Sequence, residues 1–322
     1  MSVLVYTSSS DGKLKKSAFE LVSYGKKVAD ELSISMFALT INVDDVSELQ
    51  NYGAERIVTV NNEKLKVFNA KGYASLIHEV AISKGASVVV IDSSIDGLYL
   101  GPLVSVALNA GYVSNVVDSP ATTSPFTVKR KAFSNKGFNN TVISTDNKVI
   151  GLAKNSFGIH KNVVSASIES FEISLSDSDL GVKSISIEKA VGKVTIADAD
   201  VVISGGRGLK GPENWAMVEE LASVLGAATA CSKPVSDLGW RPHAEHVGQT
   251  GKPVATNLYI AIGISGAIQH LAGINASKVK VVINIDPEAP FFKAADYGIV
   301  GDAFDVVPQL ISKLKDFKAQ NS

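Results

Sequence analysis

The chain has 322 residues, enough for one large domain or two ordinary ones, and its 45% hydrophobic and 20% charged residues are typical of a globular protein with a full core. The 31 basic and 32 acidic residues leave a net charge of -1, so nothing global indicates nucleic acid or an anionic membrane as a partner. The single cysteine, Cys231, excludes an intrachain disulfide and a four-cysteine zinc site, and it fits a reducing compartment.

The N-terminal segment enters a predicted strand almost at once. It lacks the charged start and long apolar run of a secretory signal, and it lacks an arginine-rich transit segment. The longest apolar runs fall short of the roughly 18 residues that a membrane helix needs. We therefore expect a cytoplasmic protein that is not itself a membrane protein.

Apolar strands alternate with amphipathic helices through the first half of the chain. In residues 15–32, Phe19, Val22 and Leu32 share one helical face, with lysines opposite. This alternation predicts a largely parallel sheet with helices on both faces. The predicted strands are 3–6, 34–41, 58–60 and 88–91, and the predicted helices are 15–32, 73–83 and 98–110.

Residues 112–180 have a different pattern, with short strands separated by glycine- and asparagine-rich turns. We expect them to be antiparallel additions to the first sheet. A serine- and aspartate-rich stretch at 176–193 then predicts a linker between an N-terminal domain (1–190) and a C-terminal domain (191–322). The short strands of this region are predicted at 127–133, 141–144, 149–152 and 165–175.

The strand–helix alternation restarts in the second half, which predicts a second α/β domain. Its strands are predicted at 199–204, 258–263 and 280–285, and its helices at 215–225 and 304–314. Open α/β sheets bind ligands at the C-terminal ends of their parallel strands. We therefore expect the functional site in the loops that follow these strands.

Glycine, polar or charged residues mark these loops, at 205–208, 263–270 and 284–286. Glycines let a phosphate approach backbone N–H groups, and a helix N-terminus carries about half a positive charge. Ser265 is predicted to start a helix and, with the neighbouring N–H groups, to be able to hold a pyrophosphate. The loops thus predict a nucleotide-like site.

The loops alone do not identify the nucleotide, and the sequence gives little support to other kinds of site. Glycine at a strand-to-helix turn usually serves only to form the turn, and none of the stretches 205–208, 263–270 and 284–286 contains a complete G-x-G-x-x-G within its own bounds. Residues 247–252 lack the P-loop spacing, and no G-x-S-x-G indicates a serine hydrolase. His243 and His246 have a spacing that metal ligands can have, but exposed loop histidines are the commoner interpretation.

Several segments, in the same order along the chain, resemble those of the alpha (large) subunit of electron transfer flavoproteins. The resemblance covers roughly residues 200–310, and the first half shares only the general plan. The segments are SGGRGL at 204–209, VGQTGK at 247–252, LYIAIGISGAIQHLAG at 258–273, NIDPEAP at 284–290 and ADYGIVGD at 295–302.

The resemblance implies a fold and a function. The fold is α/β with two domains, each a largely parallel sheet flanked by helices, and the C-terminal domain is a Rossmann-like FAD-binding fold. The N-terminal domain packs against a smaller beta subunit, which gives a heterodimer. The protein is then an electron carrier and not an enzyme: it shuttles electrons from flavin dehydrogenases, such as the acyl-CoA dehydrogenases of fatty acid beta-oxidation, to a membrane quinone oxidoreductase.

The resemblance also implies roles for residues around the flavin ring. Arg207 lies over the isoalloxazine, and Ser232, Gln249 and Thr250 hydrogen-bond the flavin, with Thr250 near N5. His270 lies near the C2 carbonyl. Negative charge gathers there in a one-electron-reduced anionic flavin, so a cation or strong donor such as His270 or Arg207 stabilises it.

The remaining contacts concern the pyrophosphate and the nucleoside. Residues 265–270 cover the pyrophosphate and the pyrimidine edge, while Asn284 and Asp302 hold the ribose and adenine side. No catalytic residue and no metal ligand is predicted. The complete set of predicted FAD-binding residues is Arg207, Ser232, Lys233, Val247, Gly248, Gln249, Thr250, Ser265, Gly266, Ala267, Ile268, Gln269, His270, Asn284 and Asp302.

Lys233 departs from the family pattern, which commonly has arginine there. Lysine keeps the charge but loses the planar fork that stacks on a ring, so we expect weaker stabilisation of the one-electron-reduced flavin. Two alternatives stay open. One is a subunit of a flavin-based bifurcating complex, which needs a second flavin in the beta subunit. The single cysteine of this chain leaves no iron–sulfur cluster, so any ferredoxin-like part would have to lie elsewhere. The other is a non-redox nucleotide-binding module, which a colourless complex would favour.

Overall fold

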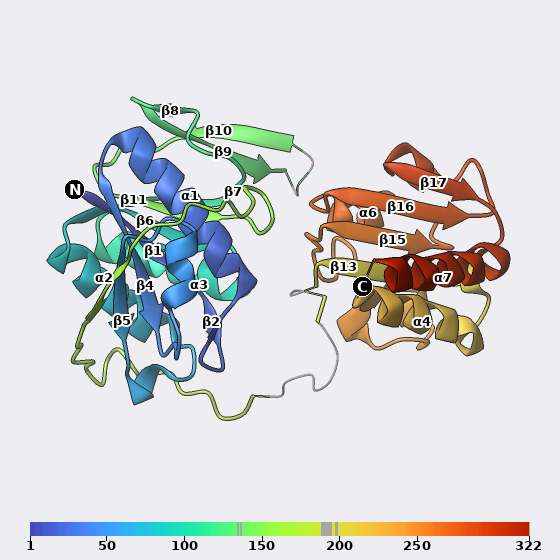
Figure 1. The fold of residues 1–322 in the computed structure, drawn as a ribbon, viewed down its shortest axis with the longest axis horizontal. Coiled ribbons are helices and arrows are strands. Elements are labelled where there is room, and N and C mark those ends of the chain that lie inside the picture. The colour runs from blue at the N-terminus through green and yellow to red at the C-terminus, as the bar shows by residue number, and fades with distance from the viewer. Residues whose placement is uncertain (134, 136, 188–194, 197–198, 322) are drawn as a thin grey trace. The chain divides into compact units, whose positions relative to one another are not determined.

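The computed structural model describes residues 1–133, 135, 137–187, 195–196 and 199–321. The chain divides into two compact units, the first formed by residues 1–133 and 137–187 and the second largely by the chain from residue 188 onward (Figure 1). Both units combine helices with sheets in which parallel pairing predominates, which confirms the predicted α/β class. The predicted boundary between residues 190 and 191 lies outside the described residues.

A ten-stranded sheet organises the first unit, in the order β10-β9-β7-β11-β6-β1-β4-β5-β12 with β8 paired to β9. Helices α1, α2 and α3 flank it, and β2 and β3 form a separate two-stranded sheet. The strands are β1 (Ser2–Tyr6), β2 (Ser9–Ser10), β3 (Lys13–Leu14), β4 (Ser35–Ile41), β5 (Arg56–Val60), β6 (Ala86–Asp92), β7 (Gly111–Val116), β8 (Thr122–Thr123), β9 (Phe126–Ala132), β10 (Gly137–Val142), β11 (Lys148–Leu152) and β12 (Ser167–Ser170). The helices are α1 (Lys16–Leu32), α2 (Ala70–Ser83) and α3 (Ile95–Ala107), with 3₁₀ turns η1 (Ser47–Asn51) and η2 (Glu63–Leu65).

Two of the strands expected to be antiparallel additions are parallel, so that expectation was wrong for them. Strand β11 lies between β6 and β7 and pairs parallel to both, with Ile150 opposite Val90. Strand β12 pairs parallel to β5. In the described part of residues 112–180, the antiparallel pairs are those of β9 with β7, β8 and β10. The residues of β11 from Val149 to Leu152 are all buried, as expected of a central parallel strand covered on both faces.

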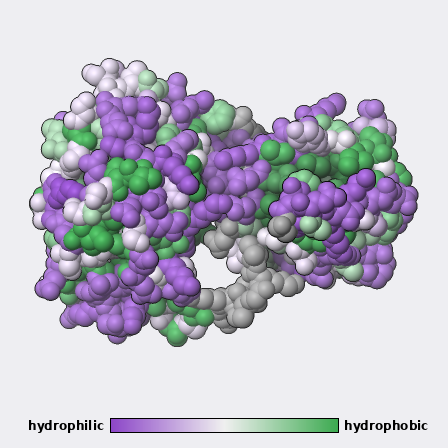
Figure 2. Space-filling model, in the orientation of Figure 1, coloured by the Kyte–Doolittle hydropathy of each residue, from purple (hydrophilic) through white to green (hydrophobic). Residues whose placement is uncertain are grey.

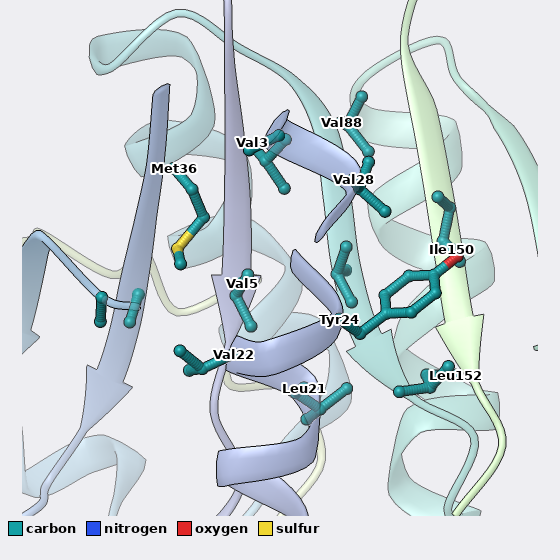
Figure 3. Packing of buried hydrophobic residues seen from close by; sticks show 14 of the residues in the cluster. Val3, Val5, Leu21, Val22, Tyr24, Val28, Met36, Val88, Ile150 and Leu152 are labelled. Atoms are coloured by element: carbon teal, nitrogen blue, oxygen red, sulfur yellow. The ribbon is translucent and has the colours of Figure 1, made fainter. Parts of the chain in front are cut away.

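Helix α1 covers one face of the first sheet, and α2 and α3 cover the other. Figure 3 shows Leu21 and Tyr24 of α1 among strand residues that include Val3, Val5 and Ile150. Fully burying a side chain of this kind contributes about 1.5–3 kcal/mol. Because burial of these side chains is favourable, the face of α1 on which the apolar residues recur is the face that packs against the sheet.

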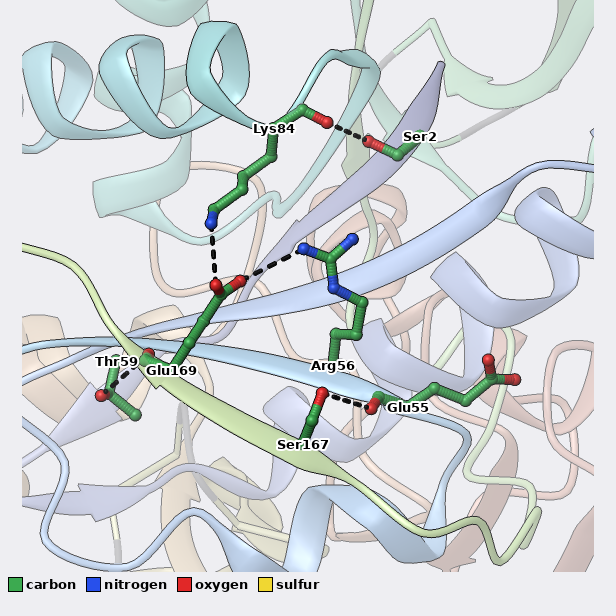
Figure 4. Close-up of polar contacts among 7 residues, drawn as sticks. All are labelled: Ser2, Glu55, Arg56, Thr59, Lys84, Ser167 and Glu169. Carbon is green, nitrogen blue, oxygen red and sulfur yellow. Dashed lines mark hydrogen bonds and ion pairs between the residues drawn. The ribbon is translucent and has the colours of Figure 1, made fainter.

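The carboxylate of Glu169 fastens the edge strand β12 to the rest of the first unit (Figure 4). It accepts from Lys84 Nζ (2.8 Å) and from Arg56 Nη2 (3.3 Å). The Lys84 hydrogen bond is the largest cause that holds the pKa of Glu169 below its ordinary value. Further on, in the predicted linker, the Ser75 hydroxyl donates to Asp179 Oδ1 (2.7 Å). The linker's first part is thus attached to α2, and its residues 188–193 lie outside the described residues.

The second unit is built on a five-stranded parallel sheet in the order β14-β13-β15-β16-β17. Helices α4 and α7 pack on one face, and α6 and the 3₁₀ turn η6 pack on the other. The strands are β13 (Val201–Gly205), β14 (Ala228–Cys231), β15 (Leu258–Ile262), β16 (Val279–Asn284) and β17 (Tyr297–Val300). The helices are α4 (Ala216–Leu225), α5 (Lys233–Asp237), α6 (Ile268–Ile274) and α7 (Ala303–Gln320), with 3₁₀ turns η3 (Arg207–Leu209), η4 (Pro212–Trp215), η5 (His243–Glu245) and η6 (Pro290–Lys293).

This strand order makes the second unit a doubly wound fold. The first strand in the chain, β13, lies between the second, β14, and the third, β15. The chain therefore leaves β13 in opposite directions on its two sides, and ligands of such sheets bind at this topological switch point. The sequence predicts β13, β15 and β16 but neither β14 nor β17.

Apolar side chains are exposed on one side of α3. Ile95, Tyr99 and Val106 are 76%, 67% and 82% exposed, and their spacing places them on one helical face. In the view of Figure 2, hydrophilic residues dominate the surface of both units, and apolar residues form separate patches. Within the described ranges, no helix combines the length and the apolar character that crossing a membrane requires.

Candidate functional site

The loops after β13 and β15 meet through glycines at the switch point of the second sheet. The N–H of Gly206 donates to the carbonyl of Ile262 (2.8 Å), and that of Gly208 donates to the carbonyl of Gly263 (3.1 Å). A Cβ on Gly206 would lie 2.1 Å from the Gly263 oxygen, and a Cβ on Gly208 would lie 2.7 Å from the Gly263 Cα. Gly263 also has a φ of +63°, which favours glycine. The crevice of this fold is therefore lined by backbone.

A small pocket opens at the same edge of the sheet. The amide of Asn284 is held on both sides, because Nδ2 donates to Ile264 O (3.0 Å) and Oδ1 accepts from the N–H of Asp286 (3.0 Å). The structure thus brings the predicted residues Asn284 and Asp302 together with two glycines of the switch point. The pocket is lined by Gly208, Lys210, Gly263, Ile283, Asn284, Ile285, Asp302 and Ala303.

Asp302 has two structural roles at this pocket. Its Oδ1 accepts from the N–H of Phe304 (3.0 Å) and so caps α7, and its Oδ2 lies 3.7 Å from Lys210 Nζ. The Lys210 ammonium is also 4.8 Å from the centre of the Phe304 ring. Sequence reasoning missed Lys210, although it directly follows the segment at 204–209 that carries the resemblance.

Ser265 does not start a helix, so that expectation was wrong. Helix α6 begins at Ile268, and the Ser265 carbonyl accepts from the N–H of Phe291 (3.0 Å). Gly266 has a φ of +88°, and a Cβ on it would lie 2.5 Å from the Phe291 nitrogen. This left-handed backbone forms a turn and delays the helix. The exposed residues of the stretch are Ser265, Ala267, Ile268 and Gln269.

The segment at 247–250 joins the end of β14 to the start of α6. The N–H of Val247 donates to the Cys231 carbonyl (3.0 Å), and that of Gln249 donates to the Gln269 carbonyl (2.8 Å). Two predicted parts of the site, far apart in the sequence, are therefore joined by backbone hydrogen bonds.

Gly248 and Gly273 make the close approach of this segment to α6 possible. A Cβ on Gly273 would lie 2.6 Å from the Gly248 Cα. Gly248 itself has a φ of +153°, at the edge of the region that favours glycine. The side chains of the next two predicted residues, Gln249 and Thr250, are exposed.

Ser232, Lys233 and Arg207 follow the adjacent strands β14 and β13 at the C-terminal edge of the sheet. The N–H of Ser232 donates to the Gly205 carbonyl (3.1 Å), which ties the two loops together. Ser232 is buried, and its hydroxyl does not cap α5. Arg207 and Lys233 have exposed side chains and place two positive charges at this edge.

His270 is buried and paired with a residue that sequence reasoning missed. Its Nε2 lies 2.9 Å from the hydroxyl of Tyr259, while its Nδ1 has no hydrogen-bond partner in the described part of the chain. Burial is the main cause that lowers the pKa of His270 to about 4. At neutral pH the buried imidazole is therefore uncharged, which leaves the donor of the two predicted roles, cation or strong donor; its contact with the flavin stays a prediction. The sequence signal that could have identified Tyr259 as buried is the alternation of side chains along β15, which places Tyr259 on the same face of the sheet as Ala261.

The sequence analysis did not predict the charged cluster of Arg241, Glu245 and Glu219. Arg241 donates to both carboxylate oxygens of Glu245, at 2.8 and 2.6 Å, and to Glu219 of α4 at 3.1 Å. Its guanidinium carbon lies 5.3 Å from the Trp215 ring. The cluster holds the stretch before His246 against α4, and the i, i+4 spacing of Arg241 and Glu245 was the only local signal.

Nothing in the described residues supports a metal or a redox thiol near this site. No group of three or more potential metal ligands is present in the part of the chain that the structure describes. His246 is buried, with its ring centre 5.3 Å from that of His243, and its pKa is lowered mainly by burial. Burial raises the pKa of Cys231 to about 12, so it remains a thiol.

Comparisons with known families give a consistent result for both units. Residues 3–176 match the family model of the electron transfer flavoprotein domain. Residues 195–275 match the model of the electron transfer flavoprotein FAD-binding domain. The second match covers β13, β14 and β15 and the loops that meet at the switch point.

Individual proteins are similar over almost the whole chain. The electron transfer flavoprotein subunit alpha of Bacillus subtilis (strain 168) is 37% identical over 317 residues, with 97% of each chain covered. Protein FixB of Clostridium saccharobutylicum is 33% identical, with 98% of this chain and 96% of the relative covered. The acryloyl-CoA reductase electron transfer subunit beta of Anaerotignum propionicum is 30% identical, with the same shares covered.

Proposed function

This chain belongs to the alpha-subunit family of electron transfer flavoproteins, and we propose that it carries electrons from flavin dehydrogenases to a membrane quinone oxidoreductase. The match of its second unit to an FAD-binding domain confirms FAD as the cofactor. The donors that we propose include the acyl-CoA dehydrogenases of fatty acid beta-oxidation. A relative named for acryloyl-CoA reductase supports redox partners that act on CoA thioesters.

The observation that carries the proposal is the convergence of the predicted FAD-binding loops at the switch point. Glycines remove side chains from the junction of β13 and β15, and Asn284 and Asp302 line the adjoining pocket. On the other side, the buried Nδ1 of His270 has no partner among the described residues. A dinucleotide requires such a bare crevice with a few polar groups, so the residues present fit FAD.

The protein's groups would then bind and tune the cofactor, which supplies the redox chemistry when bound. Arg207 and Lys233 provide positive charge that favours an anionic reduced ring, and neutral His270 provides an N–H at a fixed position. Gln249 and Thr250 have exposed side chains that can donate hydrogen bonds. Asn284 and Asp302 would hold the ribose and adenine side. These assignments stay predictions.

We propose further that the first unit docks a beta subunit to form a heterodimer, as the resemblance implies. The exposed apolar residues of α3, including Ile95, Tyr99 and Val106, support a partner-facing surface on this unit. A cytoplasmic location is part of the same proposal.

Stepwise anaerobic reduction of the purified complex, followed by visible absorption, tests the proposed function. We expect a yellow complex with about one FAD per heterodimer that passes through a one-electron-reduced species. Two flavins, one of which skips that species, would instead favour a bifurcating complex. A complex that purifies without flavin would contradict the electron-carrier proposal and favour a non-redox nucleotide-binding module.

A further inference from the structure

Tyr259 and His270 form an enclosed hydrogen-bonded pair in the second unit. The Tyr259 hydroxyl lies 2.9 Å from His270 Nε2, and both side chains are buried. The ring of Phe291 is parallel to that of Tyr259 within 4°, with centres 6.4 Å apart, and its centre is 6.1 Å from that of His270. The pair is therefore held by packing as well as by the hydrogen bond, and the imidazole has one defined orientation.

The surroundings decide which atom carries the imidazole proton. Burial raises the pKa of Tyr259, so its phenol stays protonated and needs an acceptor. His270 Nε2 is within reach as the acceptor. The Ser204 hydroxyl has no hydrogen-bond partner by geometry among the described residues, and its influence lowers the pKa of Tyr259, as a donor to the phenol oxygen does, so it does not replace Nε2 as the acceptor. A phenol that donates to Nε2 leaves the proton of a neutral imidazole on Nδ1.

The opposite edge of the ring is consistent with this assignment. The backbone of Val247 lies close enough to His270 to raise its pKa, although Nδ1 makes no hydrogen bond with a described residue. Val247 begins the 247–250 segment, which is bonded to the start of α6 through Gln249 and Gln269. His270 thus lies beside the segment to which the proposed flavin contacts belong, and its Nδ1 is the ring nitrogen left without a partner among the described residues.

We propose that Tyr259 is a positioning residue: its hydroxyl fixes His270 as the Nδ1–H tautomer, so that a neutral donor faces the flavin-binding segment. The effect on flavin rests on the proposed function, whereas the tautomer itself does not. Without the Tyr259 hydroxyl, Nε2 becomes a buried acceptor with no donor, and the proton is free to move to it. The hydrogen bond offered on the Nδ1 side is then weakened or lost.

The direct test reads the tautomer by NMR in the FAD-loaded complex with its partner subunit. The alpha chain is labelled with ¹⁵N-histidine, and His270→Gln identifies the signal of His270 among the five histidines. We expect a protonated Nδ1 and an unprotonated Nε2 in the native protein, and a shift of population toward Nε2–H in Tyr259→Phe. A native protein with Nε2–H would overturn the proposal, even if the variant cannot be purified.

Tyr24→Phe is the matched control, because Tyr24 is also fully buried but its hydroxyl has no hydrogen-bond partner among the described residues. It should leave the tautomer and the flavin reduction potential unchanged, while Tyr259→Phe shifts both. A tautomer shift without a change in potential would overturn the link to the flavin only. Absence of FAD from the native complex would instead contradict the proposed function and leave the tautomer measurable on the chain.

Discussion

Gly206 and Gly263 are in contact at the junction of β13 and β15, where a Cβ on Gly206 would lie 2.1 Å from the carbonyl oxygen of Gly263. The two residues belong to loops that leave adjacent parallel strands, and Gly206 also donates its N–H to Ile262 (2.8 Å). The separation of these loops is set by backbone atoms alone. Any side chain at this contact would move one loop away from the other.

Gly206→Ala should therefore destabilise the second unit and weaken FAD binding. Its φ of -113° suits alanine, so the cost comes from overpacking and is about 1–3 kcal/mol. Urea unfolding and flavin titration of the variant would measure both effects. Gly137→Ala is the control, because a Cβ there meets nothing within 4 Å. Equal stability of the two variants would contradict the role given to the glycine contact.

Arg241→Ala should destabilise the protein by about 2 kcal/mol, a value between those of exposed and buried ion pairs. Arg241 is only 17% exposed and binds Glu245 and Glu219. Its loss should also loosen the stretch before Val247 and weaken FAD binding, which flavin titration would detect.

The matched control for this change is an ion pair whose acidic partner, Glu220, lies on α4 next to Glu219. Lys315 pairs with Glu220 at 2.7 Å, but the two side chains are 56% and 53% exposed. Lys315→Ala should change the free energy of unfolding by less than about 0.5 kcal/mol. If both variants lose the same stability, the Arg241 cluster does not have the role proposed for it.

Two substitutions at Asp302 should separate its capping role from its charge. Asp302→Ala should cost about 1 kcal/mol, because α7 loses the acceptor for the Phe304 N–H, while Asp302→Asn keeps that cap. Both should weaken FAD binding if the carboxylate holds the ribose side. Chemical denaturation and flavin titration measure the two roles, and an Asn variant with native affinity would remove the carboxylate from the proposed site.

Lys233→Arg should increase the amount of one-electron-reduced flavin that accumulates during stepwise reduction. Lys233 is exposed at the start of α5, and arginine adds a planar fork that can stack on the ring. Spectrophotometry during anaerobic reduction measures the yield. An unchanged yield would show that the departure from the family pattern at this position has no effect.

His270 should make the stability of the protein fall below pH 6.5. Burial lowers its folded pKa from 6.5 to about 4, so between these values the unfolded chain binds a proton that the folded chain does not. The contribution is present in full above pH 6.5 and is lost progressively toward pH 4, by up to about 3 kcal/mol. The gap in unfolding free energy between the native protein and His270→Gln should therefore narrow as the pH falls, and a constant gap would contradict the buried neutral state.

Local patterns in the sequence determined the elements and the cofactor. The apolar period of residues 15–32 predicted α1, because burial on one face requires that period whatever the partner. The segments at 204–209 and 258–273 resemble those of electron transfer flavoprotein alpha subunits, and this resemblance predicted the family and FAD, because it is carried by residues that are contiguous in the sequence. Both predictions are confirmed.

Relations between distant segments were decided only by the tertiary structure. The place of β11 between β6 and β7 depends on where the chain returns after the antiparallel hairpin, which no local pattern encodes. The charge of His270 follows from its burial, and its partner Tyr259 lies in a different element, so the sequence alone left a cation and a strong donor both open where the fold provides a neutral imidazole. Pairing, burial and proton position depend on which residues meet in space, whereas periodicity and motif spacing are properties of single segments.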